Sequence, residues 1–485
     1  MKNYVKYIPL FVLSIIALLM LFAAITPKEI AGVKLRRSNI ISQVVDDRTL
    51  LRHLPWVEFE QQDLGFDLFT ELPQVVGLPP KKSPLNSPAA TMDSDTVVAQ
   101  VTFSEFPASR PQTPEGLVAF EDFSPSGELL KPLAIKLLNR YAVRIAFLGD
   151  SFIEGDIFTQ DIRAQLQAAF GGQGVGFVPI TSTTAGFRRS VGHTFDGWLT
   201  SSILKGGLSS SFMLNGASYT PEHQGAWVNY RGTNHRNSLA YFAKARLLLR
   251  AQAATQLMVK VNGGVGEMIE VAPAQGLQEI LLERDSMSSI NFAVAGPIEG
   301  LTLYGASIEG RGGVVVDNFS TRSYSGTTLS ELSAPLCGAM DSLLHYDMIV
   351  LEYGLNSAGQ DNVKAYTHYM EQMTRVVAHL EALFPKSIIL VMSVSDRQRM
   401  ATDGTWETLP SIAALSRAQR TLAQQNGLVF WNTLLAMKGL GGMNSFVSHG
   451  WAAKDYTHLS AGGGRVLAKE FVKALLNEQQ HFVAQ

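Results

Sequence analysis

Cysteine is almost absent from this chain of 485 residues, which contains only Cys337. A single cysteine cannot form a disulfide within the chain and cannot supply the set of thiolates that a cysteine-rich metal site requires. The ten histidines show no spacing typical of metal ligands. The sequence therefore predicts no metal and no cofactor, and its cysteine content does not indicate a compartment.

An excess of charge of either sign is also missing. The chain has 40 Lys and Arg against 42 Asp and Glu, which gives a formal net charge of −2, and it has no long run of one sign. Proteins that bind nucleic acid by neutralising phosphates need a basic surface, so we expect no nucleic-acid partner. Hydrophobic residues make up 46% and charged residues 17%, which indicates a folded, globular body.

Long hydrophobic runs are missing except near the amino terminus. Residues 8–25 are uncharged, mostly apolar and about long enough to cross a bilayer as a helix, and they follow Lys2 and Lys6. No good cleavage site follows, so an uncleaved signal anchor is favoured over a cleaved signal peptide. Four basic residues at positions 28–37 leave the orientation open. We expect an inner-membrane anchor, with the rest of the chain in the periplasm or otherwise outside the cytoplasm.

Changes in composition divide the chain further. Residues after Pro79 are rich in Pro, Ser, Thr and Ala, which is typical of a linker. Regular patterns begin near residue 116. The expected parts are a signal anchor or signal peptide at 1–26, an irregular region and linker at 27–115, the first part of an α/β domain at 116–185, an inserted β-rich module at 186–310 and the second part of the α/β domain at 311–485.

Buried strands alternate with helices on both sides of the expected insert. Residues 142–148 are apolar and β-branched, and a helix is expected at 159–170. Further strands are expected at 313–316, 347–352, 387–393 and 427–431, separated by helices such as 364–383 and 410–425. This alternation indicates a parallel sheet covered on both faces, with the active site at the carboxyl ends of its strands.

The insert has a different pattern, in which short strands alternate polar and apolar residues. Residues 257–261 end at Asn262-Gly263-Gly264, a strong turn signal. Further strands are expected at 226–230, 243–249, 268–271, 279–282, 290–294 and 301–304. Their number is sufficient for an antiparallel β-sandwich.

Gly149-Asp150-Ser151 lies at the end of the first buried strand. There a serine hydroxyl projects into the crevice at the sheet edge, and a backbone amide can face a developing oxyanion. Ser151 is therefore the candidate nucleophile. A serine after a strand is more often a helix cap, so this assignment needs a base and a residue that orients the base.

Asp455-Tyr456-Thr457-His458 can supply both of these groups. A spacing of three residues lets a carboxylate and an imidazole face the same point. Asp455 would then orient His458, and His458 would deprotonate Ser151. Taken alone, the motif is more often a surface loop with a histidine, and its pairing with Ser151 is what favours catalysis.

Two further strand ends offer donors for an oxyanion. Gly326 lies in Ser325-Gly326-Thr327-Thr328, and Asn356 lies in Gly354-Leu355-Asn356-Ser357. We expect Gly326 and Asn356 to form the oxyanion hole together with the amide of Ser151. Either residue taken alone is more often part of an ordinary turn or loop.

The order of these motifs along the chain resembles the four signature blocks of the SGNH/GDSL hydrolases. The residues that match the family's namesake positions are Ser151, Gly326, Asn356 and His458. The resemblance covers about residues 140–476 apart from the insert. It implies a flavodoxin-like three-layer α/β/α fold and a serine esterase.

Residues 149–159, 170–177 and 430–443 look closer still to the peptidoglycan O-acetylesterases, a branch that also carries a β-rich, carbohydrate-binding-like insert. The third block usually reads Gly-x-Asn-Asp, and Ser357 stands here in its last position. This departure concerns the support of that loop more than the Asn356 donor.

The sequence does not match two signatures of other protein classes, one of the α/β-hydrolases and one of dinucleotide-binding proteins. Ile153 stands where the Gly-x-Ser-x-Gly elbow of an α/β-hydrolase needs its second glycine. The glycine-rich residues 171–176 follow a helix rather than a strand, which disfavours a dinucleotide loop.

The sequence thus predicts an envelope-anchored esterase that removes O-acetyl groups from a polysaccharide through an acyl-enzyme on Ser151. The resemblance and the insert imply peptidoglycan or another acetylated polysaccharide as the substrate and partner. Trp198, Trp227 and Tyr230 are candidates for stacking on sugar, although aromatic residues of β modules are more often in the core. An O-acetyltransferase and a catalytically silent polysaccharide-binding protein remain as alternatives.

Overall fold

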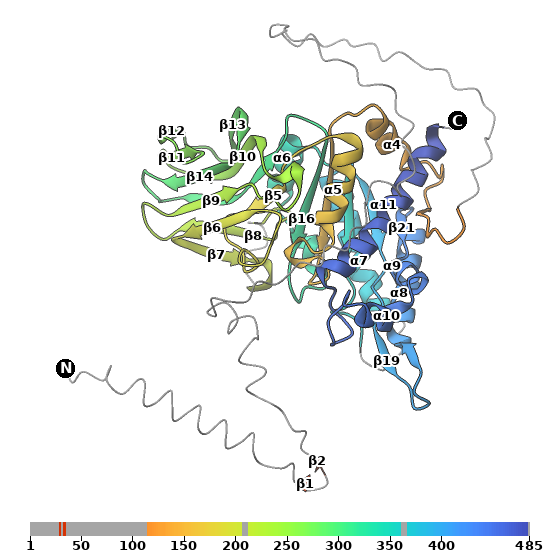
Figure 1. Ribbon diagram of the computed structural model, residues 1–485. Coiled ribbons are helices and arrows are strands. Elements are labelled where there is room, and N and C mark those ends of the chain that lie inside the picture. The colour runs from red at the N-terminus through yellow and green to blue at the C-terminus, as the bar shows by residue number, and fades with distance from the viewer. Residues whose placement is uncertain (1–28, 31–32, 35–113, 206–211, 360–365, 484–485) are drawn as a thin grey trace. The chain divides into compact units, whose positions relative to one another are not determined.

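The computed structural model describes residues 29–30, 33–34, 114–205, 212–359 and 366–483 (Figure 1). The chain forms two units, Met1–Pro73 and Gln74–Gln485. In the first, the described residues are the antiparallel pair β1 (Glu29–Ile30) and β2 (Val33–Lys34). The predicted anchor at 1–26 and most of the predicted linker lie outside the described residues. Within the described ranges, no helix has the length and apolar character needed to span a membrane.

A parallel sheet forms the centre of the α/β part of the second unit. Its strands are β4 (Val143–Gly149), β16 (Val314–Ser320), β17 (Met348–Glu352), β18 (Ile388–Met392) and β21 (Val429–Trp431). The spatial order β16-β4-β17-β18-β21 is the 2-1-3-4-5 order of flavodoxin-like folds, and β3 (Glu121–Asp122) pairs antiparallel with β21. Residues of β4, β17, β18 and β21 are buried throughout, as expected for strands covered on both faces.

The helices form two groups by their contacts. In the first group, α11 (Ala461–Val483) packs against α4 (Lys131–Leu138) and α5 (Thr159–Phe170). In the second, α7 (Thr367–Leu383) packs against α6 (Ala334–Leu344) and α8 (Pro410–Gln425). The short helices α9 (Thr433–Gly439) and α10 (Gly442–Ser448) follow β21.

Phe471 fastens α11 to the sheet. Its ring contacts those of Phe147, Phe158 and Trp431 edge-on, at centroid distances of 5.6, 6.1 and 5.2 Å. Such edge-to-face pairs add to the free energy gained by burying the rings. The helix that follows Asp455 and His458 in the chain is thereby packed against the sheet.

Two antiparallel sheets lie between α5 and β16. One has the order β13-β10-β15-β8-β7 with β5 beside β15, and the other has the order β12-β11-β14-β9-β6. Their bounds are β5 (Gly176–Pro179), β6 (Gly192–Asp196), β7 (Trp198–Ser202), β8 (Ala217–Pro221), β9 (Trp227–Arg231), β10 (Phe242–Ala251), β11 (Thr255–Val261), β12 (Glu267–Val271), β13 (Gln278–Met287), β14 (Ser289–Val294) and β15 (Leu301–Glu309).

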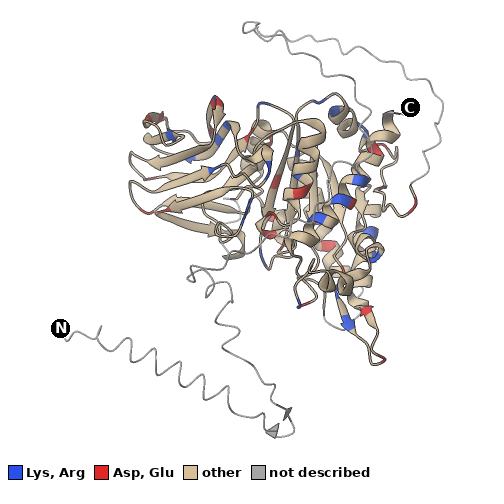
Figure 2. Ribbon diagram, viewed as in Figure 1, with Lys and Arg blue, Asp and Glu red and all other residues tan. Residues whose placement is uncertain are grey.

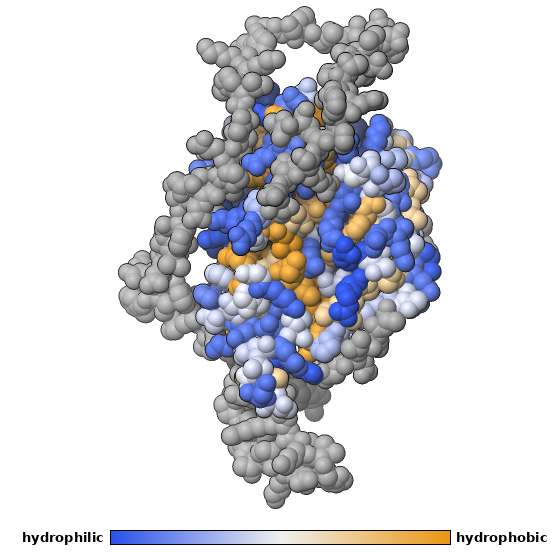
Figure 3. Space-filling model, turned by 90° about the vertical axis from the view of Figure 1, so that its right-hand side faces the viewer, coloured by the Kyte–Doolittle hydropathy of each residue, from blue (hydrophilic) through white to orange (hydrophobic). Residues whose placement is uncertain are grey.

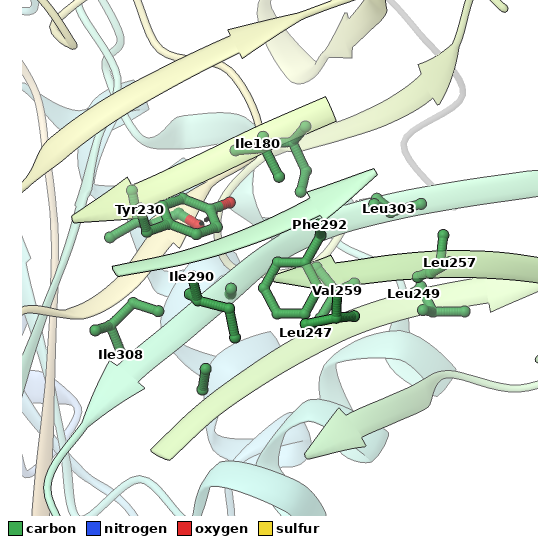
Figure 4. Close-up of a cluster of buried hydrophobic side chains, with 14 of the residues drawn as sticks. Ile180, Tyr230, Leu247, Leu249, Leu257, Val259, Ile290, Phe292, Leu303 and Ile308 are labelled. Atoms are coloured by element: carbon green, nitrogen blue, oxygen red, sulfur yellow. Dashed lines mark hydrogen bonds between the residues drawn. The ribbon is translucent and has the colours of Figure 1, made fainter. Parts of the chain in front are cut away.

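The two sheets share one apolar core, so they form a sandwich (Figure 4). Leu247 and Leu303 come from one sheet, and Val259 and Phe292 come from the other. All seven strands expected from the sequence of the insert are present. The start expected at residue 186 is too late, because β5 begins at residue 176 and pairs with β15.

Buried charges join this sandwich to the parallel sheet. Arg144 of β4 contacts Asp317 of β16 at 2.8 Å and Glu309 of β15 at 2.6 Å. Asp317 also accepts hydrogen bonds from the hydroxyl of Tyr346 and from the amide of Phe177. Because removing one partner would leave buried charges unpaired, this contact specifies how the two parts meet.

The remaining charges are spread over the described surface, and Figure 2 shows both signs interspersed. On the face seen in Figure 3, hydrophobic side chains gather near the centre and hydrophilic ones surround them. The interspersed charges of Figure 2 agree with the absence of long runs of one sign in the sequence.

Candidate active site

The ends of three neighbouring strands meet at Gly149. The register of the sheet places Gly149 of β4 between Ser320 of β16 and Glu352 of β17. A Cβ atom at position 149 would lie 2.8 Å from the carbonyl oxygen of Glu352, so only glycine fits there. The next two residues, Asp150 and Ser151, therefore turn out of the sheet at its carboxyl edge.

Ser151, His458 and Asp455 form one continuous chain of contacts. The Oγ of Ser151 lies 3.2 Å from the Nε2 of His458, and the Nδ1 of His458 lies 2.7 Å from the Oδ2 of Asp455. Because an ionised carboxylate only accepts hydrogen bonds, Nδ1 carries the proton, and Nε2 of the neutral ring is free to accept the proton of the serine. The three residues predicted from the sequence are thus brought together in the order that nucleophilic catalysis needs.

The carboxylate of Asp455 is held by its own loop. Its Oδ1 accepts hydrogen bonds from the amides of Thr457 at 2.9 Å and His458 at 3.0 Å. Partial burial raises the pKa of Asp455, but the hydrogen bonds from the His458 side chain and from these amides outweigh it and lower the pKa overall. Asp455 therefore remains ionised at neutral pH and keeps the imidazole in one tautomer.

Asn356 lies against the nucleophile loop. Its Nδ2 donates to the Oδ2 of Asp150 at 2.8 Å and to the carbonyl oxygen of Tyr324 at 3.1 Å. These two bonds engage both hydrogens of the amide, so Asn356 can donate to an oxyanion only if the longer bond, to Tyr324, is shared or released. The same two bonds tie the loop of Asn356 to Asp150, the residue before the serine, and to the segment that leads to Gly326.

Gly326 begins the short helix η6 (Thr327–Glu331) with a left-handed backbone, at φ 80°. A Cβ atom here would lie 2.6 Å from the ring of Tyr353, so position 326 requires glycine for both conformation and space. Among the described residues, no hydrogen bond joins Gly326 to Ser151, and the oxyanion role of Gly326 stays a prediction.

Two buried carboxyl groups lie beneath the serine. Burial raises the pKa of Asp150 to about 6, against the lowering effect of hydrogen bonds from Phe152 and Asn356. Burial and the neighbouring Asp150 raise the pKa of Glu352 well above its ordinary value. One oxygen of Glu352 has no hydrogen-bond partner among the described residues. Burial thus favours the neutral form of both carboxyl groups, and the neighbouring Asp150 adds to this effect at Glu352.

The comparisons with known proteins bear on the fold. No family model matches the chain, and no curated protein matches it in sequence. A solved structure of a peptidoglycan O-acetylesterase matches with a TM-score of 0.60 at 22% identity, over 74% of this chain and 99% of the other. This chain shares the fold of that esterase.

A family two carbohydrate esterase from Cellvibrio japonicus also matches, at 10% identity over 63% of this chain and 98% of the other. Its TM-score of 0.25 is too low to show a shared fold. The match to the peptidoglycan O-acetylesterase structure confirms the fold that the sequence resemblance implies.

One candidate in the insert is wrong. Tyr230 is fully buried in the sandwich core, and its hydroxyl donates to the carbonyl oxygen of Pro179 at 3.0 Å. It has no surface to offer a sugar. Trp198 and Trp227 are half-buried, and the ring nitrogen of Trp198 donates to the carbonyl oxygen of Trp227 at 2.8 Å, so these two remain neighbours at the edge of the sandwich.

The sequence did not predict the ion pairs that hold the segment after Ser151. Asp156 is buried in the short helix η2 (Glu154–Asp156) and contacts both Arg163 of α5 and Arg188. Glu154 forms a bidentate ion pair with Arg322. The sequence does not show which charges pair: Arg163 follows Asp156 by seven residues, but Arg188 and Arg322 are much farther from their partners, and charged residues give no periodic signal of burial.

A hollow of about 460 Å³ lies beside the loops of Gly326 and Asn356. The residues that line it include Ser325, Thr327, Ser357, His368 and Gln372. Its size falls within the range of small-molecule sites, and its lining offers hydroxyl and amide side chains that can form hydrogen bonds. Ser357, the departure from the usual third block, is one of these lining residues.

Proposed function

We propose that the protein is a serine esterase that removes O-acetyl groups from a cell-envelope polysaccharide, with peptidoglycan as the first candidate substrate. The observation that carries this proposal is the continuous contact from Ser151 through His458 to Asp455 at the carboxyl edge of the sheet. A structural role for three such residues would not require this order of donor and acceptor.

In the first half of the reaction, the Oγ of Ser151 attacks the acetyl carbonyl carbon while Nε2 of His458 takes the hydroxyl proton. Asp455 stabilises the imidazolium that results. The negative charge on the carbonyl oxygen is held by the amides of Ser151 and Gly326 and by the side chain of Asn356, once its bond to Tyr324 is shared. Collapse breaks the ester bond, and the sugar oxygen leaves with the proton from His458.

In the second half, a water molecule attacks the acetyl group on Ser151. His458 takes a proton from this water and returns it to the serine oxygen as acetate leaves. Asp455 and His458 are both exposed, so water can approach the acyl-enzyme. This exposure favours hydrolysis over transfer of the acetyl group to a second sugar.

The hydroxyl and amide side chains that line the hollow beside Gly326 and Asn356 support a carbohydrate substrate. Sugar hydroxyls pair with side chains such as those of Ser325, Thr327 and Gln372 without any charge being buried. In this proposal the hollow takes part of the glycan while the acetyl group reaches Ser151, and the half-buried Trp198 and Trp227 stay candidates for a second place where the polysaccharide stacks.

Acetate release tests the proposal directly. The purified protein and its Ser151→Ala variant would be incubated with O-acetylated peptidoglycan and, in parallel, with an acetylated plant polysaccharide. We expect release from peptidoglycan by the wild type alone. Release from the plant polymer alone would show that the substrate is not peptidoglycan. Acetylation of an added sugar without acetate release would show that the protein is a transferase and not an esterase.

A lack of all turnover would favour a silent binding protein. A fluorophosphonate that labels reactive serines separates this outcome from a wrong choice of polymer. Labelling of the wild type but not of Ser151→Ala would show an active serine whose substrate is still to be found. No labelling of either would overturn the catalytic proposal itself.

The proposal includes a location. The uncharged run at residues 8–25 supports an anchor in the inner membrane, with the esterase facing the periplasm, where an envelope polysaccharide is within reach. Protease added to cells whose outer membrane has been made permeable should digest the carboxyl-terminal part. Full protection of that part in such cells would contradict this location.

A further inference from the structure

An aromatic pair lies next to the catalytic histidine. The ring of Trp406 stacks on the ring of Tyr456 at a centroid distance of 4.2 Å and an interplanar angle of 16°. Tyr456 stands between Asp455 and His458 in the sequence, whereas Trp406 belongs to a hairpin about 50 residues earlier. The stack therefore joins a distant element to the loop that carries two of the three catalytic groups.

Tyr456 has a left-handed backbone, with φ 56°. For a bulky residue this conformation is unfavourable and persists only where the surroundings enforce it. Here the left-handed backbone of Tyr456 lies in the turn in which the amides of Thr457 and His458 both donate to the Oδ1 of Asp455. The carbonyl of His458 also accepts a hydrogen bond from the amide of Ala453.

The hairpin of Trp406 is fixed at its base. It consists of β19 (Gln398–Met400) and β20 (Trp406–Thr408), and it follows the carboxyl end of β18. Fully buried Asp396 accepts hydrogen bonds from the hydroxyl of Thr408 and from the amide of Met443, each at 2.8 Å. The side chain of Gln398 accepts one from the amide of Asn444 at 2.7 Å. Trp406 is thus presented from a support tied to the sheet end and to α10.

We propose that Trp406 is a positioning residue that holds the loop of Asp455 and His458 in its catalytic conformation by stacking on Tyr456. The ring of Trp406 covers the ring of Tyr456 and keeps the strained backbone at this position from relaxing. His458 is half-exposed, so the interior of the protein does little to hold it, and the stack supplies the missing restraint. This inference rests on the proposed esterase activity for its kinetic test.

The test compares three variants with the wild type. Trp406→Ala removes the stack, and Trp406→Phe keeps an aromatic ring. Glu407→Ala truncates the next residue of the same strand, whose side chain points to the other face of the hairpin and pairs with Arg399. Turnover would be measured on a small acetyl ester that is too short to reach beyond Ser151, and melting temperatures would be recorded for all four proteins.

For Trp406→Ala we expect kcat to fall about 10- to 100-fold while KM changes little, because small misplacements of a catalytic group cost this much. Trp406→Phe should recover most of the loss, and Glu407→Ala should match the wild type. An unchanged kcat in Trp406→Ala would overturn the proposal. So would an equal loss in Glu407→Ala, which would indicate a general effect of the hairpin, or a rise in KM alone, which would make Trp406 a substrate contact.

A spectroscopic measurement keeps the inference testable if the wild type hydrolyses no ester at all. We expect the proton between Nδ1 of His458 and Asp455 to give a low-field signal in the proton NMR spectrum, and His458→Ala would identify this signal by its loss. We expect Trp406→Ala to weaken or shift this signal while Trp406→Phe and Glu407→Ala retain it. A signal unchanged in Trp406→Ala would overturn the positioning role, whereas a missing activity with a responsive signal would count against the esterase alone.

Discussion

Ser151 and His458 are 307 positions apart in the chain, and the Oγ of the first lies 3.2 Å from the Nε2 of the second. The parallel sheet places the serine at the end of β4, and Phe471 packs α11, the helix that begins just after the histidine, against Phe147 of the same strand. The contact is therefore a product of the whole fold rather than of a local motif.

Because Ser151 and His458 act as one unit, their removal should not be additive. We expect Ser151→Ala and His458→Ala each to lower kcat for acetate release by at least about 1,000-fold, and the double variant to be no slower than either. Initial rates for the four proteins on one acetyl ester measure this. A double variant slower by the product of the two single losses would mean that the residues act separately.

Asp455→Asn tests the tautomer of His458. The amide oxygen of asparagine can still accept from the amides of Thr457 and His458, but its NH₂ group would face Nδ1 and turn that atom into an acceptor. Nε2 would then carry the proton and could not take the one from Ser151. We expect kcat to fall about 100- to 10,000-fold with the fold intact.

Asp403→Asn is a matched control for this change. Asp403 is a fully exposed carboxylate at the tip of the β19–β20 hairpin, where it accepts from Thr405. Its substitution should leave kcat unchanged. Equal losses in the two variants would show that the effect of Asp455→Asn does not come from the imidazole.

Asn356→Ala tests the donor to the oxyanion. Loss of one such donor costs about 100- to 1,000-fold in kcat, and KM should change far less because the charge develops only in the transition state. Asn426→Ala, at the end of α8, removes a side-chain amide that donates to Leu422 of its own helix, and it serves as the control. An unchanged kcat in Asn356→Ala would leave the amides of Ser151 and Gly326 as the oxyanion donors.

Much of the fold follows from pattern alone. The expected strand at 142–148 is β4 shifted by one residue, and the expected helix at 159–170 coincides with α5. The candidate residues Ser151, Gly326 and Asn356 all follow parallel strands, and the carboxyl ends of such strands meet at one edge. Their proximity was therefore predictable once the strands were recognised.

The burial of Tyr230 could have been predicted from the alternation of side chains along its strand. In β9, Val228 and Tyr230 are buried, and Trp227 and Arg231 lie on the other face. Since side chains alternate along a strand, a tyrosine two residues after a buried valine belongs to the same apolar face. Alternation thus separates Trp227 from Tyr230, which residue type alone does not.

Contacts between distant polar or aromatic residues could not be derived in this way. Trp406 lies in a hairpin of two three-residue strands, too short to give a periodic pattern, and nothing in the sequence pairs it with Tyr456. Similarly, β5 is a four-residue strand whose partner β15 begins more than 120 residues later. Periodicity indicates which face of an element is buried, but it does not say against what.

The stability of the serine loop should depend on Asp156. Its carboxylate contacts Arg163 at 2.7 Å and Arg188 at 3.3 Å, and all three side chains are buried. Asp156→Asn leaves the two guanidinium groups without their counter-charge, so we expect the free energy of unfolding to fall by about 3 to 5 kcal/mol. Glu121→Gln, which breaks the exposed pair with Arg420, should cost less than about 1 kcal/mol.

The same group predicts a pH dependence with a definite sign. Burial by itself raises the pKa of Asp156, but the charges of Arg163 and Arg188 outweigh it and hold the pKa well below its ordinary value. An acid with a lowered pKa in the folded state stabilises that state above the pKa of the unfolded chain, about 3.9, and loses this contribution as the pH falls toward the folded value. Denaturant unfolding followed by tryptophan fluorescence should therefore show a constant difference between wild type and Asp156→Asn from pH 5 to 8 and a shrinking difference below about pH 4. A difference that instead grew on acidification would mean that Asp156 is bound as a neutral acid, and the two arginines would then have to find their counter-charge elsewhere.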